Sequence, residues 1–305
     1  MPKTTDHWAG RPEAGSTFGL RLLAWLARHL GRRPLLLVLY PVTPYFYLVR
    51  APERAASRTY LQRVLQRPVR ESDVLRHFHA FARTTADRFF FLTGQEGQIP
   101  LTFVGGEDAQ AVVDGARGGL FLAAHLGSFE AARVVGAQLG GMDLRIVLDQ
   151  KIGGRFVDVM RELNPNLVAN MIDAGQDSVA LGLEIGAALK GGRWVGFLAD
   201  RTRGDASGND REVTIPFLGT PARFPAGPYL IASTFRAPII CAFCRLTADG
   251  YEVHCEVLSQ GVRLPRESRT EALQLLATRY VERLEHHVRA APLSWFNFYD
   301  FWQRP

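Results

Sequence analysis

The chain has 305 residues, long enough to bury a full hydrophobic core, and its apolar fraction of 47% is ordinary for a globular protein. These values exclude a mostly disordered chain and leave one large domain or one domain with an appendage. The net charge of +6 is uneven, because residues 1–90 hold 15 Lys and Arg against 6 Asp and Glu. The basic N-terminal part favours an anionic partner, either nucleic acid or a membrane surface.

The apolar residues of this basic part favour the membrane. Residues 18–30 are expected to form an amphipathic helix that carries Trp25, and residues 34–49 are uncharged. The second run is shorter than the roughly 20 residues that span a bilayer, and Pro41 and Pro44 are expected to break it. Its Tyr and Phe content favours a monotopic, interfacial anchor, with a buried core hairpin as the alternative. A cleaved signal peptide is not expected, since the first residues lack a basic region followed by an apolar one.

Two helical patterns follow, at about 53–66 and 72–93, and from about residue 101 strands alternate with helices. The expected strands are 101–104, 119–124, 144–149, 194–199, 238–246 and 251–258, and the expected helices are 107–115, 128–139, 153–163, 177–190, 224–235 and 268–290. This alternation predicts an α/β fold with a largely parallel or mixed sheet flanked by helices. The last two strands are expected to pair as an antiparallel hairpin at one edge. We assign residues 1–100 to a helical, membrane-associating region and 101–305 to the α/β part, as one continuous unit.

A histidine and a glutamate stand together after one predicted strand. The apolar run 120–124 is typical of a strand buried on both faces, and His125 follows it. Ser128 is a good N-cap, so Glu130 falls in the first turn of the next helix, where the helix dipole favours a charged carboxylate. The Gly127 turn is expected to fold His125 back over Glu130, which would fix the tautomer of the imidazole. The same spacing also fits a strand-end His next to an unrelated helix-start Glu.

Other charged residues follow the neighbouring strands. Asp149 and Asp200 each come directly after a strand, and ligands bind beyond the carboxyl ends of parallel strands. Arg201 and Arg203 come next in the loop, and their guanidinium groups suit a phosphate or a carboxylate. A turn residue at Asp200 and a solvated loop at the arginines are the alternatives.

The three cysteines predict neither a disulfide framework nor a metal site. Cys241 and Cys244 lie in a strand pattern, where positions three apart face opposite sides. No second pair of ligands stands nearby at zinc spacing. Buried, reduced thiols are therefore expected for these two and for Cys255, which suits a cytosolic face.

Several of these segments occur together in one known family. They are His125 to Glu130, Asp200-Arg-Thr-Arg-Gly204, Val213-Thr-Ile-Pro-Phe-Leu-Gly219, Phe224-Pro-Ala-Gly-Pro228 and Ala237-Pro-Ile-Ile240. In this order they resemble the lysophospholipid acyltransferase superfamily, in the branch of the late acyltransferases of lipid A biosynthesis. The resemblance covers about residues 18–302. The Phe-rich segment 72–93 and the aromatic C-terminal tail suggest a divergent subgroup that acts on another lipid.

The resemblance implies a membrane-associated acyltransferase on the cytoplasmic face of the inner membrane. It would move a fatty acyl group from an acyl carrier protein or coenzyme A thioester to a hydroxyl or amine of a lipid or glycolipid, without a cofactor or metal. His125 would be the general base, with Glu130 orienting it, and the activated thioester would make a Ser or Cys nucleophile unnecessary. Substrate binding would involve Arg155, Arg161, Asp200, Arg201, Arg203 and Gly204.

Three other functions stay open. A thioesterase would use the same base with water in place of the lipid acceptor. A non-catalytic, peripheral lipid-binding protein is disfavoured by the intact His125/Glu130 pair. Nucleic-acid binding through the basic N-terminus is the weakest hypothesis, because apolar residues are interleaved with the basic ones.

Overall fold

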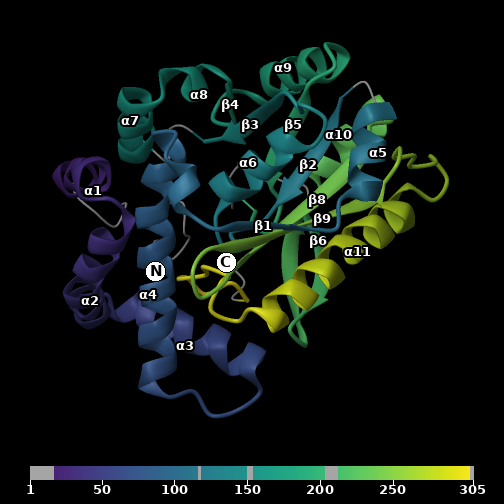
Figure 1. Cartoon of the computed structure of the whole chain (residues 1–305). Coiled ribbons are helices and arrows are strands. Elements are labelled where there is room, and N and C mark those ends of the chain that lie inside the picture. The colour runs from purple at the N-terminus through teal and green to yellow at the C-terminus, as the bar shows by residue number, and fades with distance from the viewer. Residues whose placement is uncertain (1–16, 116–117, 150–153, 203–211, 303–305) are drawn as a thin grey trace.

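Four helices form the first part of the chain (Figure 1): α1 (Thr17–Leu30), α2 (Arg32–Val49), α3 (Ala51–Leu65) and α4 (Glu71–Leu92). The structure is a computed structural model, and it describes residues 17–115, 118–149, 154–202 and 212–302. Helix α4 contacts the other three helices and also α6 of the α/β part. The N-terminal helices and the α/β part therefore share packed surfaces.

A seven-stranded sheet follows, in the order β1-β9-β8-β2-β5-β3-β4. Its strands are β1 (Leu101–Val104), β2 (Gly119–Ala123), β3 (Leu144–Leu148), β4 (Met171–Asp173), β5 (Trp194–Leu198), β8 (Ile239–Leu246) and β9 (Tyr251–Ser259). Five neighbouring strands, from β8 to β4, run parallel, and β9 and β1 run the opposite way. The predicted α/β fold with a largely parallel or mixed sheet is confirmed. The β8–β9 hairpin forms as predicted but is not at the edge, because β1 pairs with the outer side of β9.

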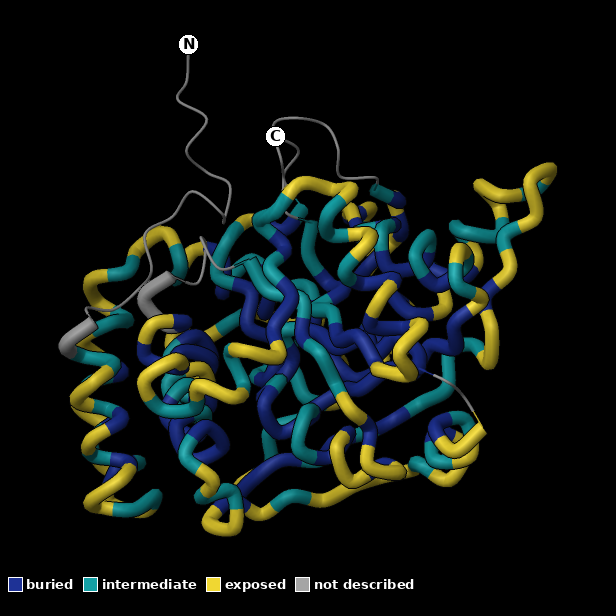
Figure 2. The backbone as a smooth tube through the Cα atoms, turned by 90° about the horizontal axis from the view of Figure 1, so that it is seen from above, coloured by how far each residue is buried: buried dark blue, intermediate teal, exposed yellow. Residues whose placement is uncertain are grey.

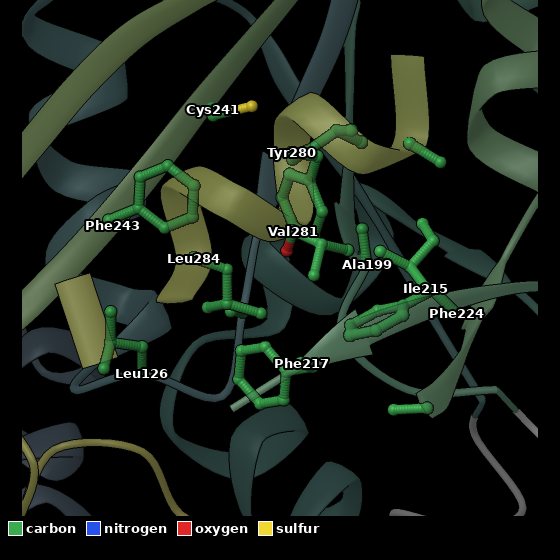
Figure 3. Packing of buried hydrophobic residues seen from close by; sticks show 14 of the residues in the cluster. Leu126, Ala199, Ile215, Phe217, Phe224, Cys241, Phe243, Tyr280, Val281 and Leu284 are labelled. Atoms are coloured by element: carbon green, nitrogen blue, oxygen red, sulfur yellow. The ribbon is translucent and has the colours of Figure 1, made fainter. Parts of the chain in front are cut away.

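Helices cover both faces of this sheet. They are α5 (Glu107–Gly115), α6 (Phe129–Gln138), α7 (Gly154–Leu163), α8 (Pro165–Ala169), α9 (Ser178–Lys190), α10 (Gly227–Phe235) and α11 (Arg269–Ala290), with a short 3₁₀ turn, η2 (Glu96–Gln98). Leu120 and Leu122 of β2 pack into a core with α9, α10 and α11, whereas Phe121 packs into a second core with α4 and α6. Successive strand residues point to opposite faces, so a strand buried on both sides is apolar throughout. Figure 3 shows part of the first core, and Figure 2 shows exposed residues on the outer elements around a buried centre.

A second, two-stranded sheet corrects one prediction. Strands β6 (Glu212–Phe217) and β7 (Thr220–Pro225) form an antiparallel hairpin, so the helix expected from residue 224 begins only at Gly227. Leu218 and Gly219 have φ of 51° and 80°, the positive values that a two-residue type I′ turn requires at both positions. Leucine rarely adopts such a φ, so the sequence carries only half of the usual turn signal.

The prediction that Pro41 and Pro44 break the second helix is wrong, because α2 continues through both residues. A proline inside a helix leaves the carbonyl four residues earlier without its N–H partner. The carbonyls concerned belong to Leu37 and Tyr40, which are 67% and 66% exposed. Pro41 and Pro44 are themselves exposed, so the interruption of the hydrogen-bond ladder lies on the outer face of α2 and not in the packed interior.

Helix α2 is apolar on two sides. Leu35 and Leu39 are buried against the neighbouring helices, while the outer side carries exposed apolar residues, namely Leu37, Tyr40, Tyr45, Leu48 and Val49. Within the described residues, no single helix is both long and apolar enough to cross a membrane. Helices α2 and α3 pass that test of length and composition only as a pair, with a bend of 97° between them.

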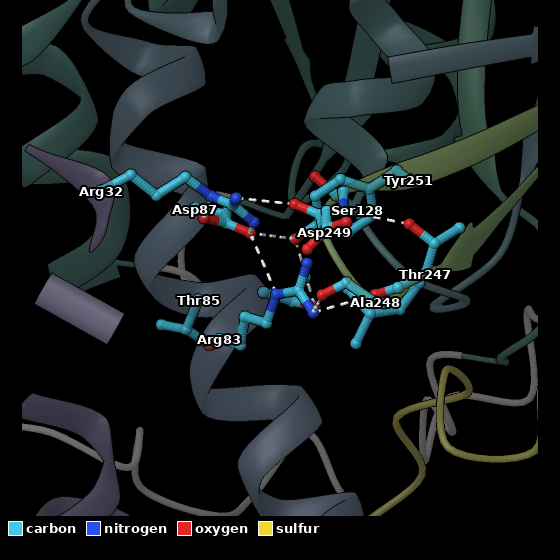
Figure 4. A network of polar contacts seen from close by, with 12 residues as sticks. Arg32, Arg83, Thr85, Asp87, Ser128, Thr247, Ala248, Asp249 and Tyr251 are labelled. Carbon is cyan, nitrogen blue, oxygen red and sulfur yellow. Dashed lines mark hydrogen bonds and ion pairs between the residues drawn. The ribbon is translucent and has the colours of Figure 1, made fainter. Parts of the chain in front are cut away.

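A buried polar network joins the N-terminal helices to the sheet (Figure 4). The Arg32 guanidinium donates to both carboxylate oxygens of Asp87, from Nε at 2.7 Å and from Nη2 at 3.0 Å. Tyr251 of β9 donates its hydroxyl to the same carboxylate at 2.9 Å. Arg83 donates to the backbone carbonyl of Thr247 in the β8–β9 turn. Helices α2 and α4 are thus connected to β9 and its turn by hydrogen bonds in which charged groups take part.

We predict that Asp87→Asn lowers the free energy of unfolding by about 3–5 kcal/mol, because it leaves the Arg32 charge buried without its counter-charge. The side chain of Asp87 is fully buried, and that of Arg32 is 10% exposed. The matched control is Asp158→Asn, which breaks an ion pair with Arg161 whose side chains are 64% and 54% exposed. This change is expected to cost less than about 1 kcal/mol. Urea unfolding of the two variants measures the difference, and equal losses would contradict the prediction.

Candidate active site

His125 projects from the carboxyl end of β2, in the centre of the sheet. All five residues of β2 are buried, and the strand pairs in parallel with β5 on one side and β8 on the other. The register places Ala123 opposite Leu198 of β5, so the loops that follow the two strands leave the sheet side by side. His125 comes two residues after Ala123, and Asp200 comes two residues after Leu198.

Asp200 is the carboxylate that orients His125. The His125 Nδ1 lies 2.8 Å from Oδ1 of Asp200, and the backbone N–H of His125 donates to Oδ2 at 3.1 Å. The expectation from the motif spacing, that Glu130 orients the imidazole, is therefore wrong. Parallel strands place residues of neighbouring loops together, and this long-range register supplies a partner that the local spacing does not reveal.

Asp200 carries a negative charge in the protein interior. Its side chain is fully buried, and burial alone would raise its pKa. The charge and hydrogen bond of His125, the nearby Arg201 and the hydrogen bond from Trp295 Nε1 (2.9 Å) together hold the pKa well below its usual range. An ionised carboxylate can only accept hydrogen bonds, so Nδ1 of His125 carries the proton and donates a hydrogen bond to Asp200. The lone pair of the neutral imidazole is then on Nε2.

The His125 side chain is 31% exposed, so a substrate can reach the ring. Burial by the surrounding residues and the positive charge of Arg201 lower the pKa of His125. The Asp200 carboxylate acts in the opposite direction, and Arg88 lowers the pKa slightly further. Because the net direction is downward, the imidazole is neutral at pH 7, as a general base requires.

Glu130 holds an arginine instead of the histidine. Ser128 accepts the N–H of Ala131 as the N-cap of α6, as predicted, and donates its own hydroxyl to Glu130 at 3.2 Å. Oε1 of Glu130 forms an ion pair with Nε of Arg88 at 2.7 Å. The motif glutamate thus positions a positive charge of α4 near the histidine. Ser128 is fully buried and already hydrogen-bonded, which makes it unsuitable as a nucleophile.

The C-terminal tail holds the histidine loop through its backbone. The N–H of Phe296 donates to the carbonyl of His125 at 2.8 Å, and the N–H of Gly127 donates to the carbonyl of Ser294 at 2.7 Å. Leu126 and Trp295 form an isolated antiparallel bridge between these bonds. The sequence indicated an aromatic tail but gave no sign that it pairs with this loop, because the two segments are about 170 residues apart.

Gly127 makes the turn after the histidine possible. Its φ is 62°, and a Cβ at this position would lie 2.5 Å from the backbone oxygen of Cys244. Any side chain would therefore force the loop away from β8. The Sγ of Cys244 accepts the N–H of Ser128 at 3.4 Å, and burial raises its pKa to about 12. This thiol stays protonated, and all three cysteines are buried and free, as predicted.

The other predicted site residues lie in different surroundings. Arg201 donates to the carbonyl of Phe296 and stacks on Tyr299 at 5.2 Å, so it contacts the tail beside Asp200. Arg161 is exposed on α7 and pairs with Asp158 of its own helix. Arg203, Gly204 and the side chain of Arg155 lie outside the described residues. Asp149 follows β3, two strands from β2. Because β2, β5 and β3 are parallel neighbours, the ends that carry His125, Asp200 and Asp149 share one edge of the sheet, as expected.

The described parts of the chain contain no group of three or more His, Cys, Asp or Glu side chains that could hold a metal ion. The Asp200 carboxylate contacts the His125 ring, and the Trp295 indole N–H and the Arg201 guanidinium contact that carboxylate in turn. These contacts keep the carboxylate ionised and the imidazole oriented, which suits proton transfer.

The family comparison identifies the family of the chain. The model of the bacterial lipid A biosynthesis acyltransferase family matches residues 107–304, which include β2, β5 and the tail. The chain belongs to this family. The resemblance inferred from the sequence motifs is confirmed, and the protein is accordingly an acyltransferase of lipid biosynthesis. Comparison with curated proteins gives no match.

Proposed function

We propose that this acyltransferase moves a fatty acyl group from a thioester, carried by acyl carrier protein or coenzyme A, to a hydroxyl or amine of a lipid or glycolipid. The observation that carries the proposal is the bond between Nδ1 of His125 and the buried, ionised Asp200. This bond presents a basic Nε2 on a partly exposed ring. Family membership supports the acyl transfer and the lipid acceptor.

The chemistry requires one base and no protein nucleophile. Nε2 of His125 takes the proton of the acceptor hydroxyl while the hydroxyl oxygen attacks the thioester carbonyl carbon. The Asp200 carboxylate stabilises the imidazolium that forms. When the tetrahedral intermediate collapses, the carbon–sulfur bond breaks, and the imidazolium proton goes to the departing thiolate. The base is then regenerated.

His125→Ala tests this assignment. Because the variant lacks the base, acyl transfer should fall by a factor on the order of 10²–10⁴ while the protein stays folded. Purified protein is incubated with a labelled acyl thioester, as acyl carrier protein or coenzyme A conjugate, and a bacterial lipid extract, and labelled lipid is measured. Full activity of the variant would contradict the proposal. Release of free fatty acid without labelled lipid would indicate a thioesterase. If the wild-type protein turns over no acceptor, it would instead be a binding protein.

The pH dependence tests the role of Asp200. Its carboxylate raises the pKa of His125, so Asp200→Asn should lower that pKa further. Since the neutral imidazole is the active form, the acid limb of the kcat/KM profile is expected below pH 6.5 in the wild type and at still lower pH in the variant. The variant's kcat should also fall at least a hundredfold, because an amide does not stabilise the imidazolium. An acid limb that moves to higher pH would contradict this assignment.

We also propose that the outer face of α2 docks on the cytoplasmic surface of the inner membrane. Its exposed apolar residues recur at helical spacing, namely Leu37, Tyr40, Tyr45 and Leu48, and exposed Trp25 on α1 lies nearby in the sequence. A soluble surface rarely exposes such a stripe, whereas Tyr and Trp are favoured at a bilayer interface. The excess of Lys and Arg over Asp and Glu in residues 1–90 adds electrostatic attraction to anionic lipids.

The double change Leu37→Glu/Leu48→Glu should lower partitioning into anionic phospholipid vesicles at least tenfold, because each buried Leu contributes about 1.5–3 kcal/mol. The control is Val179→Glu/Leu183→Glu on α9, where both residues are 70% exposed. This pair adds the same negative charge to another face. Its partitioning into the vesicles should therefore stay within about twofold of the wild-type value. Vesicle sedimentation measures both. Equal losses would show that charge alone, and not the α2 face, controls binding.

A further inference from the structure

Trp295 is the largest fully buried side chain of the described residues, and its environment is aromatic. Its ring packs edge-on against Tyr60 of α3, Phe217 of β6 and Phe301 of the tail, with centroid distances of 5.0, 5.2 and 5.0 Å. Three separate segments thus fix the orientation of the indole. A buried indole N–H needs an acceptor, and the one it reaches is Oδ2 of Asp200 at 2.9 Å.

The bonds of Asp200 are divided between its two oxygens. Oδ1 receives Nδ1 of His125, and Oδ2 receives the indole N–H and the backbone N–H of His125. The carboxylate plane is therefore set by donors on both sides. Without the indole, Oδ2 keeps a 3.1 Å backbone hydrogen bond and a longer, 3.9 Å ion pair with Nε of Arg201, and the carboxylate gains freedom to rotate away from Nδ1.

We propose that Trp295 is a positioning residue for acyl transfer: its indole N–H fixes the Asp200 carboxylate, and the carboxylate fixes the His125 ring. This role rests on the proposed function of His125 as the base. The charge and packing around the pair support it. Arg201 acts electrostatically on both Asp200 and His125, and Arg88 acts on His125. Burial raises the pKa values of the buried Tyr280 and the half-buried Tyr299, and both are close enough to Asp200 for its charge to raise them further.

The only polar atom of the Trp295 side chain is the one that contacts Asp200, so the indole N–H can be tested separately from the packing. Tyr280 already donates its hydroxyl to the carbonyl of Ala123 at 2.9 Å. Arg201 is directed to the tail carbonyl of Phe296. The Nε of Arg201 lies 3.9 Å from Oδ2 of Asp200, too far for a hydrogen bond, so in this structure neither group supplies the bond that the indole provides.

Trp295→Phe tests the proposal against Trp302→Phe. Trp302 belongs to the same aromatic cluster, 6.3 Å from Trp295, but donates its N–H to the carbonyl of Phe217 at 3.3 Å. We expect Trp295→Phe to lower kcat at least tenfold with KM within twofold, and Trp302→Phe to keep both within about twofold. In proton NMR of protein with ¹⁵N-labelled histidine, the downfield Nδ1–H signal of His125 should broaden or shift in Trp295→Phe alone.

An unchanged kcat and an unchanged Nδ1–H signal in folded Trp295→Phe would overturn the proposal, as would equal effects in both variants. If Trp295→Phe does not fold, 3-benzothienylalanine at position 295 keeps the ring shape and replaces the N–H with sulfur. The same loss of kcat and the same change in the signal are then expected. The NMR signal also separates this inference from the proposed function. Should His125→Ala stay active, the base assignment fails, while the signal still reports whether the indole aligns the pair.

Discussion

The ionised carboxylate of Asp200 is the group on which the arrangement of the site depends. It is fully buried, and a buried carboxylate without donors takes up a proton instead of keeping its charge. Its donors come from the loop after β2 and from the C-terminal tail, with the positive charge of Arg201 beside it. Satisfying one charge therefore brings together three segments that are far apart in the sequence.

The two acidic residues near His125 have different physical roles. Asp200 shares a sheet edge with the histidine and bonds to its ring, whereas Glu130 begins a helix and pairs with Arg88 of α4. Glu130 thus acts on the histidine only through the position of an arginine. In this chain the His125 and Glu130 side chains thus serve the same site through different partners.

The sequence predicts the elements of this site better than their contacts. Continuous apolar runs identify β2 and β5 because strands buried on both faces have no polar side, and the placement of Asp200 at a strand end follows from them. The partner of His125 depends on which strands become neighbours, and long-range packing decides this. The position of Trp295 cannot be predicted from the sequence for the same reason, since this tail residue reaches Asp200 only when the chain folds back on the β2 loop.

Two rules of local sequence also fail here: that proline ends a helix, and that a residue at positive φ in a tight turn is glycine or asparagine. The prolines of α2 face outward, and the hairpin β6–β7 turns through a leucine at positive φ.

Helix α4 links the proposed membrane face to the site through two consecutive residues. Asp87 bonds to Arg32 at the start of α2, and Arg88 pairs with Glu130 beside the histidine loop. Adjacent residues of a helix point about 100° apart, so one turn of α4 can hold both partners. Tyr251 bonds to the same Asp87, which ties this turn to the sheet as well. With α2 docked as proposed, these contacts would connect the base to the docking helix and hold it at one height above the bilayer. An acceptor whose acyl chains remain in the membrane requires that constraint.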